Sequence, residues 1–443
     1  MSTLPSKWNN EAYVSLHLVQ TMLEMAGLPR NSSYSHWYPE FDIFVPSTGT
    51  NKAADFLVED FRKYVNFLVE IKSARTRIND NARFQLKMYL QHSGIRFGLL
   101  VDPFLVEIYH YNQGQCTLWD KHNIQNPTKV NPVADFLRSF LESVRMRTIA
   151  FHTSKGGVGK TTLTVNVAFE LAKLGNRVLV IDLDDQANSS LYLGVNRADE
   201  LDQANTVDEF DQILESFQER KEVIDFLGLD FNSLNINYKD YIKPSTFNQY
   251  IYGNGRIDVL PGSYRTRDEG LTSTLGIREK LLNKALQRSG MASDYNYVII
   301  DTPPSSTMVA KNGLFAAQYV VIPTQMEYFS VYGIRTVTRK IQNEVQEEMN
   351  GERGRILGIV PMMTGGTKLN NLATQLIQRT LPNVKIFTEI TRTVKWAEAC
   401  QKYMPISVFA ERDATAGAAA TKSSTLAQEL IAQIDQEESQ RGV

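Results

Sequence analysis

The sequence has little cysteine and no long hydrophobic run. Cys116 and Cys400 are the two cysteines among 443 residues and lie far apart, so we expect neither a disulfide framework nor a cysteine zinc site. No apolar run approaches the roughly 20 residues that span a bilayer, and the N-terminus lacks the basic-then-apolar pattern of a secretory signal. These absences predict a soluble protein of a reducing compartment.

The chain also has almost no net charge, with a formal value of -2. The 47 Lys and Arg residues nearly balance the 49 Asp and Glu residues, which excludes a histone-like polycation although local basic patches remain allowed. With 42% hydrophobic residues, the composition is that of ordinary globular proteins. The length of 443 residues predicts two to three domains of roughly 100–200 residues each.

A domain boundary is predicted at about residue 145. Residues 134–144 have the apolar spacing of an amphipathic helix, and the Asn- and Pro-rich stretch 122–132 before them is typical of a loop. A strand, a Gly-rich turn and a new helix follow at once. The sequence therefore predicts one domain at 1–145 and a second at 146–443.

The second domain alternates short apolar strands with helices. Runs that are apolar on both faces are expected for central parallel strands covered by helices on both sides, so the fold class is α/β with a doubly wound, mostly parallel sheet. The smaller N-terminal domain is also expected to be α/β. Residues 196–256 have no place in this pattern and are expected to form a helical insertion, with a helix at 206–227. The predicted strands are 147–152, 177–182, 297–301, 319–323 and 355–361.

The strongest motif in the chain is a phosphate loop at 154–162. Its glycines let backbone N–H groups approach phosphate oxygens, and the helix that follows adds partial positive charge. Lys160 would reach the β- and γ-phosphates, and the Thr161 hydroxyl would ligate Mg²⁺. The loop consists of Ser154, Lys155, Gly156, Gly157, Val158, Gly159, Lys160, Thr161 and Thr162.

Three aspartates follow predicted strands downstream of this loop. Asp182 and Asp184 are two residues apart just past one strand, so their side chains share a face. Asp301 ends another apolar strand, where the Walker B aspartate of a phosphate-loop protein would contact water bound to Mg²⁺. Together with the phosphate loop, these positions favour a site that hydrolyses a nucleoside triphosphate.

The phosphate loop resembles the deviant Walker A box of the ParA/MinD family of ATPases. Ser154 stands where the usual pattern has Gly, and Lys155 is the additional lysine typical of that family. The resemblance covers about 147–435, although Thr391 replaces a proline of the family pattern. It implies hydrolysis of ATP to ADP and phosphate with Mg²⁺, in which Asp184 positions or activates water and Asp182 supports the Mg²⁺ shell.

The same resemblance implies the partners. Lys155 would reach across a homodimer to the partner's phosphates, so that ATP binding and dimerisation depend on each other. ParA-type members bind DNA non-specifically through scattered cations, which match Lys368, Arg392 and Lys395, with Arg335, Arg339 and Lys340 as weaker candidates. A ParB-like or adaptor protein would stimulate hydrolysis. The C-terminal 20 residues are amphipathic but acidic, unlike the basic membrane helix of MinD-type members, so no membrane partner is expected.

The N-terminal domain carries a second constellation. Asp55 is expected at the start of a short strand that a charged turn follows. Glu70 and Lys72 lie two residues apart in the next strand, so a hairpin could join all three. Asp…Glu-x-Lys is the minimal Mg²⁺ site of PD-(D/E)xK nucleases, in which the lysine acts on the attacking water. Gln85 and Tyr89 lie one helical turn apart, as in RecB-like nucleases. The order of these residues resembles the N-terminal domain of type I restriction R subunits, with Glu11 as the family's additional carboxylate and a local basic stretch formed by Lys72, Arg75, Arg77, Arg83 and Lys87.

Three functions remain open at this point. The first is a ParA-type ATPase, cytoplasmic and nucleoid-associated in a prokaryote, that positions a plasmid, a chromosome region or a protein assembly. The alternative is a DNA nuclease effector, for example in phage defence, gated by the ATPase domain. The third is a nucleotide-dependent scaffold, which a water-positioning Asp184 argues against. No winged helix is evident before residue 145, so binding to its own operator is not predicted.

Overall fold

A computed structural model describes residues 4–46, 49–112, 114–195, 205–209, 212, 221–229, 238–263, 278–304, 307–327, 330–365 and 368–440. The chain folds into two units, and the division falls between Met146 and Arg147. The N-terminal unit contains Met1–Met146 and also Leu286–Asp294; the C-terminal unit contains Arg147–Leu229, Tyr238–Ala285 and Tyr295–Val443. No helix among the described residues is both long and apolar enough to cross a membrane.

The N-terminal unit is built on a six-stranded sheet whose spatial order follows the sequence, β1-β2-β3-β4-β5-β6. All neighbouring strands are antiparallel except β3 and β4, which are parallel because a helix, α3, connects them. The strands are β1 (Ser35–Val45), β2 (Thr50–Asp60), β3 (Val65–Ile71), β4 (Phe97–Asp102), β5 (Leu105–Asn112) and β6 (Gln115–Asn123).

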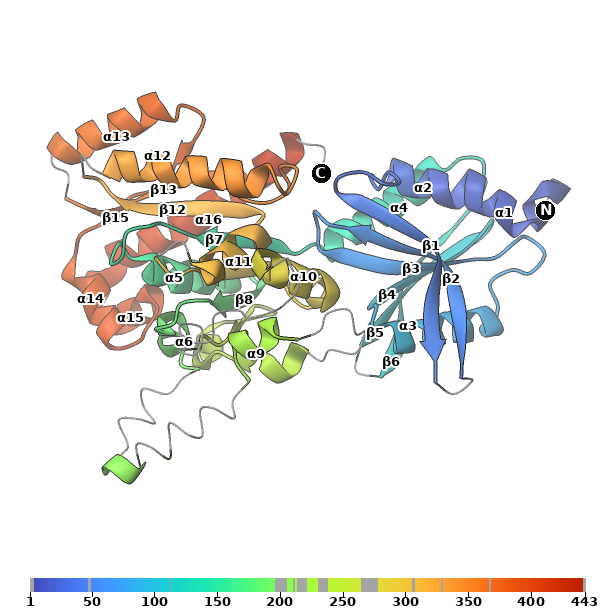
Figure 1. Cartoon of the computed structure of the whole chain (residues 1–443), viewed down its shortest axis with the longest axis horizontal. Coiled ribbons are helices and arrows are strands. Elements are labelled where there is room, and N and C mark those ends of the chain that lie inside the picture. The colour runs from blue at the N-terminus through green and yellow to red at the C-terminus, as the bar shows by residue number, and fades with distance from the viewer. Residues whose placement is uncertain are drawn as a thin grey trace. The chain divides into compact units, whose positions relative to one another are not determined.

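Helices cover both faces of this sheet (Figure 1). On one face, Leu86 and Tyr89 of α3 (Asp80–Ser93) pack against Leu57 and Leu100. On the other face, Phe140 of α4 meets Phe97 edge-on, with ring centroids 5.1 Å apart. The helices on that face are α1 (Glu11–Val14), the π-helix η2 (Ser15–Gln20), α2 (Thr21–Met25) and α4 (Asn131–Ser143).

The C-terminal unit contains a nine-stranded, mostly parallel sheet. Its order is β14-β13-β12-β7-β11-β8-β10-β9, with β15 also paired to β13, and β9 is the antiparallel strand. The five strands predicted from the sequence are present, two of them longer than expected. The strands are β7 (Arg147–Phe151), β8 (Arg177–Asp182), β9 (Lys243–Pro244), β10 (Arg256–Leu260), β11 (Tyr297–Asp301), β12 (Tyr319–Gln325), β13 (Arg355–Thr364), β14 (Lys385–Ile386) and β15 (Ile390–Thr391).

Alternate residues of the central strands bury opposite faces of this sheet. Ile149 and Ile299 belong to a core that includes α5 (Lys160–Lys173) and α16 (Gly417–Gln440). On the opposite face, Thr148 donates a hydrogen bond to the carbonyl of Ala316 in α11 (Met308–Ala316), 2.9 Å away. The parallel strands therefore end at one edge of a sheet that helices sandwich, the arrangement that places ligands at strand C-termini. The remaining helices are α6 (Asn188–Tyr192), α9 (Val223–Leu227), α10 (Leu281–Arg288), α12 (Ser330–Lys340), the π-helix η8 (Ile341–Gln346), α13 (Lys368–Thr380), α14 (Val394–Gln401) and α15 (Ile406–Arg412).

The predicted insertion at 196–256 lies largely outside the described residues. Within the described part, the predicted helix at 206–227 includes the short α9 (Val223–Leu227). The end of the segment contains two short 3-10 helices, η3 (Tyr238–Tyr241) and η4 (Thr246–Tyr250), and joins the sheet as β9 and β10. Strand β10 was not predicted, because Asp258 interrupts its apolar run. In the structure Asp258 is buried and accepts a hydrogen bond from the Tyr295 hydroxyl, 2.9 Å away.

Candidate functional site

The predicted phosphate loop connects the end of β7 to the start of α5. Gly157 and Gly159 have φ angles of +71° and +95°, a left-handed conformation that favours glycine. A Cβ atom at Gly156 or Gly157 would have no neighbour within 4 Å, so the loop backbone is open to a ligand. No side chain caps the N-terminus of α5, which leaves its first N–H groups free for an anion.

A partly buried contact joins this loop to the end of β11. The Thr161 hydroxyl donates to Asp301 Oδ2 at 2.8 Å, and Asp301 Oδ1 is buried with no hydrogen-bond partner. Such an orphaned carboxylate oxygen fits a water molecule of a Mg²⁺ shell, and the Thr161 hydroxyl beside it fits a direct ligand. No group of three or more His, Cys, Asp or Glu within the described part of the chain is placed to hold a metal by itself. Phosphate oxygens and water would therefore supply most of the ligands.

The loop after β8 carries the two other predicted aspartates. Asp182 is fully buried and accepts hydrogen bonds at Oδ2 from the backbone N–H and hydroxyl of Ser190, at 2.9 and 2.7 Å. The backbone N–H of Asp184 donates to the other oxygen of Asp182 at 3.2 Å. Gln186 N–H donates to Asp184 Oδ1 at 3.1 Å, so Asp182 fixes the loop and the loop orients Asp184.

Buried charges dominate the electrostatics of the site. Burial, with a further contribution from the nearby Asp182, raises the pKa of Asp301 to about 7. Burial also raises the pKa of Asp184, to about 6. Burial lowers the pKa of Lys160, whereas Asp301 and Asp184 raise it. A divalent cation would relieve this repulsion between carboxylates, which agrees with a Mg²⁺ site beside the loop.

A cavity of about 310 Å³ adjoins the phosphate loop. Gly159 and Thr162 line it on one side, and segments distant in the sequence line the rest. Its surface is mainly apolar, as expected for a pocket that takes a flat ring. Sequence reasoning did not assign these residues to a nucleotide pocket, because they come from separate segments, and it grouped Arg392 with the DNA-binding cations. They are Met362, Met363, Ile390, Thr391, Arg392, Thr393, Trp396, Ala397 and Cys400.

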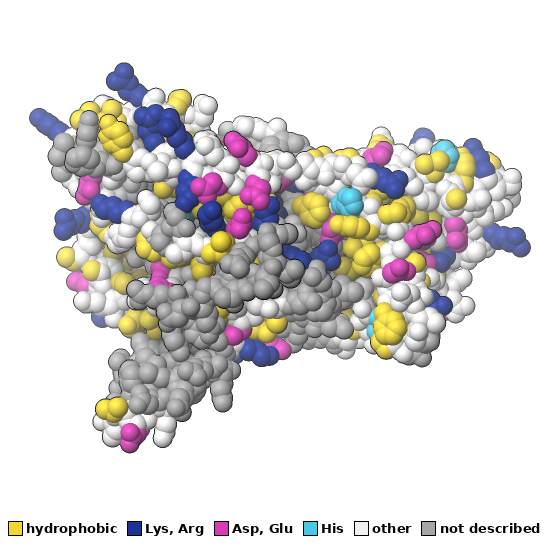
Figure 2. Space-filling model, in the orientation of Figure 1, with side chains coloured by type: hydrophobic (Ala, Val, Ile, Leu, Met, Phe, Trp, Pro, Cys, Tyr) yellow, Lys and Arg dark blue, Asp and Glu magenta, His cyan; other side chains and the backbone are white. Residues whose placement is uncertain are grey.

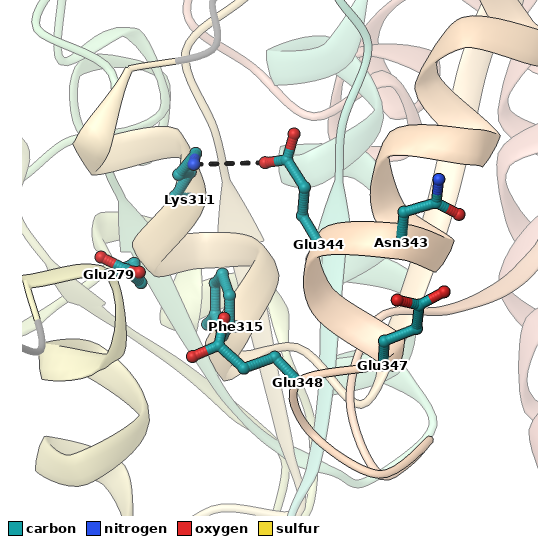
Figure 3. Close-up of a pocket in the computed structure, with 7 residues that line it drawn as sticks. All are labelled: Glu279, Lys311, Phe315, Asn343, Glu344, Glu347 and Glu348. Atoms are coloured by element: carbon teal, nitrogen blue, oxygen red, sulfur yellow. Dashed lines mark ion pairs between the residues drawn. The ribbon is translucent and has the colours of Figure 1, made fainter.

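A second cavity, of about 400 Å³, does not suit a triphosphate. Four glutamates line it, Glu279, Glu344, Glu347 and Glu348, against one lysine, Lys311. Figure 3 shows Lys311 of α11 paired with Glu344 of η8, at 3.2 Å. Its surplus of carboxylates would repel phosphate groups. The cavity beside the phosphate loop therefore remains the candidate nucleotide pocket.

Lys155 lies at the same edge of the sheet and is half exposed. Its ammonium group donates to Gln325 Oε1 at 2.8 Å and to Glu327 Oε2 at 3.0 Å, both just after or at the end of β12. The side chain is 53% exposed and that of Glu327 is 60% exposed, so this ion pair is weak. The ammonium group of Lys155 is therefore accessible to an anion.

The cations predicted to bind DNA have different surroundings. Lys368 is exposed at the start of α13, and Arg335 and Arg339 are exposed on α12. Figure 2 shows Lys and Arg side chains gathered over these two helices on the visible face. Lys395, in contrast, pairs with Glu398 and Asp413, at 2.8 and 2.9 Å, which neutralises its charge.

The six residues predicted as a nuclease-like centre are brought together in the N-terminal unit. The hairpin of β2 and β3 pairs Phe56 with Val69, and the backbone N–H of Ile71 donates to Asp55 Oδ2 at 2.6 Å. Lys72 Nζ donates to Glu70 Oε1 at 2.7 Å. Burial raises the pKa of Glu70 to about 7, with further contributions from Asp55 and Glu11. Asp55 lies within β2 rather than at a strand start, and Lys72 directly follows β3.

The remaining two members face this cluster from α3. Gln85 Nε2 donates to the Tyr89 hydroxyl at 2.7 Å. Burial raises the pKa of Tyr89, and the charges of Glu70, Lys72 and Asp55 also act on it. Of the predicted basic stretch, Arg77 pairs with Asp102 and Arg83 forms a bidentate pair with Glu107, so both cations are already neutralised. Arg75 and Lys87 are exposed.

Comparisons with known proteins agree with this geometry. The AAA domain family matches residues 146–352. Sporulation initiation inhibitor protein Soj of Bacillus subtilis is 30% identical over 266 residues, which cover 60% of this chain and 91% of Soj. Chromosome-partitioning ATPase Soj of Thermus thermophilus is 31% identical over 257 residues, covering 58% of this chain and 85% of that protein.

A solved structure shares the fold. Apo McdA of Cyanothece aligns with a TM-score of 0.50 and 20% identity, covering 65% of this chain and all of McdA. The parallel sheet, the glycine-rich loop and the helix after it define the C-terminal unit as a phosphate-loop nucleoside triphosphatase. The chain belongs to the Soj/ParA family of phosphate-loop ATPases. The domain match begins at residue 146 and does not include the N-terminal unit.

Proposed function

We propose that the protein is an ATP-dependent, dimerising ATPase that binds DNA non-specifically and positions a cargo. The observation that carries this proposal is the partly buried contact between Thr161 and Asp301, with Lys160 and Asp184 close enough to perturb each other's pKa. A phosphate loop, a Walker B carboxylate and a candidate water-positioning carboxylate thus meet at one edge of the sheet.

The triphosphate of ATP would lie on the N–H groups of the loop and at the start of α5. Lys160 would bind the β- and γ-phosphates, and the adenine ring would occupy the 310 Å³ cavity beside Gly159 and Thr162. Mg²⁺, held through Thr161 and through water on Asp301, would neutralise charge on the phosphates.

Asp184 is placed to orient the attacking water. Asp184 is 7% exposed and its carboxylate accepts a hydrogen bond from the Gln186 N–H, which leaves acceptor capacity for water. Asp182 holds the backbone of this loop, so its contacts support a positioning role as well as the predicted support of the Mg²⁺ shell. Lys155 would leave Gln325 and Glu327 and bind the phosphates in a second copy of the chain, which makes dimerisation depend on ATP.

DNA binding is proposed for the α12–α13 surface. Lys368, Arg335 and Arg339 are exposed there, whereas the ion pairs of Lys395 argue against its predicted role. Contacts of this kind are electrostatic and independent of sequence. The cargo would be a plasmid, a chromosome region or a protein assembly, and a ParB-like or adaptor protein would stimulate hydrolysis. This proposal places the protein on the nucleoid in the cytoplasm.

Hydrolysis and nucleotide binding can be tested separately. Asp184→Asn should abolish phosphate release while ATP still binds, because the amide keeps the shape but loses the charge that orients water. Trp396 is a convenient probe of binding, since it lines the cavity and the other tryptophans, Trp8, Trp37 and Trp119, belong to the N-terminal unit. Hydrolysis at the wild-type rate in the Asp184→Asn variant would contradict the proposed role.

The cavity can be tested with the two cysteines. Cys400 lines the cavity, whereas Cys116 is in the N-terminal unit. Mg-ATP should protect Cys400 from addition of N-ethylmaleimide, measured by peptide mass spectrometry, and should not change the labelling of Cys116. Equal labelling of Cys400 with and without Mg-ATP would place the base elsewhere.

A second candidate function is DNA cleavage by the N-terminal unit, gated by the ATPase unit, as in a phage-defence effector. The specific observation is Glu70, which is 3% exposed, with Oε1 bonded to Lys72 and Oε2 buried without a hydrogen-bond partner. Asp55 and Glu70 could hold Mg²⁺ while Lys72 acts on water at a phosphodiester. Glu11, Gln85 and Tyr89 would orient this centre.

Cleavage is tested with supercoiled plasmid, Mg²⁺ and ATP. Nicking that Lys72→Ala removes, and that Lys87→Ala retains, would support a nuclease; Lys87 is the matched lysine because it is exposed on α3. Intact plasmid with a salt-sensitive gel shift would support positioning alone.

A further inference from the structure

The cavity beside the phosphate loop has one charged side chain, Arg392. Every other residue that lines it is uncharged, and most of its surface is apolar. Among the described residues, no ion pair joins Arg392 to a carboxylate, whereas Lys395, three positions further on, binds two. Arg392 is exposed at this apolar cavity, so its charge is accessible to an anionic ligand that also carries a flat apolar ring.

The backbone fixes Arg392 on both sides. Its N–H donates to the carbonyl of Thr364 at the end of β13, 2.9 Å away, and β15 directly precedes it. Thr393, directly after it, caps α14 by accepting a hydrogen bond from the Lys395 N–H at 3.3 Å. The backbone of Arg392 is therefore held between a strand and a helix. This lowers the entropy that the residue loses when it binds a ligand.

The opposite wall of the cavity is the start of α5. Thr162, two residues after Lys160, lines the same cavity as Arg392. A nucleotide whose β- and γ-phosphates lie on Lys160 has its α-phosphate nearer the base, at the entrance of this cavity. A guanidinium group there can donate two parallel hydrogen bonds to that phosphate.

We propose that Arg392 binds the α-phosphate of the nucleotide and is not part of the DNA-binding surface. This inference rests on the proposed ATP site and reassigns a residue that the sequence pattern grouped with DNA-binding cations. In the ATP-bound protein Arg392 is covered by the nucleotide and is not available to a DNA backbone.

The test is a series of calorimetric titrations of the full-length chain with Mg-ADP, AMP and adenosine. Arg392→Ala should lower the affinity for ADP and for AMP by about tenfold each, the effect of losing a charge-assisted hydrogen bond. The affinity for adenosine should not change. Arg392→Lys should recover part of the loss because it keeps the charge, and it also guards against misfolding of the alanine variant. Arg412→Ala is the matched control, since Arg412 is exposed and bonds to the Tyr250 hydroxyl rather than lining the cavity.

DNA affinity gives the second readout. In the presence of a non-hydrolysable ATP analogue at saturation, the slope of log affinity against log salt should be the same for wild type and Arg392→Ala. Full ADP affinity in Arg392→Ala, or a slope smaller by about one, would overturn the assignment. An equal loss of affinity for adenosine and for AMP would also overturn the assignment, because the variant would then have lost the cavity rather than a phosphate contact. If wild type binds none of the nucleotides, the proposed ATP site itself fails.

Discussion

His152 couples the stability of the C-terminal unit to pH. It directly follows β7 and is 5% exposed, and its Nδ1 lies 2.9 Å from the Thr302 hydroxyl oxygen. That hydroxyl donates its proton to the carbonyl of Phe151, at 2.9 Å, so it accepts from His152, whose Nδ1 carries the hydrogen of a neutral ring. Burial, with a further contribution from Lys160, lowers the pKa of His152 to about 4.

The size and sign of the effect follow from this pKa. In the unfolded chain a histidine has a pKa of about 6.5, so between pH 6.5 and 4 the unfolded state binds a proton that the folded state does not. Stability is therefore lost as the pH falls. From pH 7.5 to pH 5 the loss from this group alone is about 2 kcal/mol.

The assay compares urea unfolding of wild type and His152→Asn at the two pH values, without nucleotide or Mg²⁺. Asparagine can still donate to Thr302 but does not titrate, so the variant should lose about 2 kcal/mol less than wild type between pH 7.5 and pH 5. Asp301 and Asp184 titrate in the same window with the opposite sign, and the comparison removes their contribution because both proteins contain them. The same pH dependence in both proteins would refute the buried, neutral His152.

Three further predictions concern charge and backbone. Arg147→Ala should destabilise the fold by about 3 kcal/mol in chemical denaturation, because Glu438, 5% exposed, loses its ion pair at 2.9 Å. Lys422→Ala, which removes a more exposed ion pair with Glu389 at 3.4 Å, should cost less than about 1 kcal/mol. Ala187→Gly should raise the free energy of unfolding by about 1 kcal/mol, because Ala187 has a φ of +48°; an unchanged or lower value would argue against strain in this loop. Glu327→Gln should tighten ATP-dependent dimerisation by up to about fivefold in sedimentation equilibrium, because it frees Lys155 from its own chain; weaker dimerisation would mean that Glu327 serves the dimer.

The parts of the fold that sequence predicts well are those with an unbroken local pattern. The strand before the phosphate loop and the strand that ends in Asp301 are apolar on both faces, so their positions and their parallel pairing follow directly. The loop itself is recognisable because glycine is required at Gly157 and Gly159, where φ is positive. The hairpin that joins Asp55 to Glu70 is predictable for a similar reason, because one charged turn separates two apolar runs.

Features that depend on distant segments of the chain were not predictable. Met362, Trp396 and Cys400 form one cavity with Gly159, yet no short motif links them. Lys395 has the spacing of a DNA-binding cation, but folding places Asp413 beside it. The segment Leu286–Asp294 belongs to the N-terminal unit, where Arg288 lies 3.7 Å from Glu59, although the flanking sequence forms the C-terminal unit.

The most direct test of the proposed function is the mass of the protein in solution with different nucleotides. Sedimentation velocity should give a monomer with ADP and a dimer with a non-hydrolysable ATP analogue and Mg²⁺, and Lys155→Ala should stay monomeric in both while still binding the analogue. The same mass with both nucleotides, or a Lys155→Ala variant that dimerises like wild type, would contradict the account.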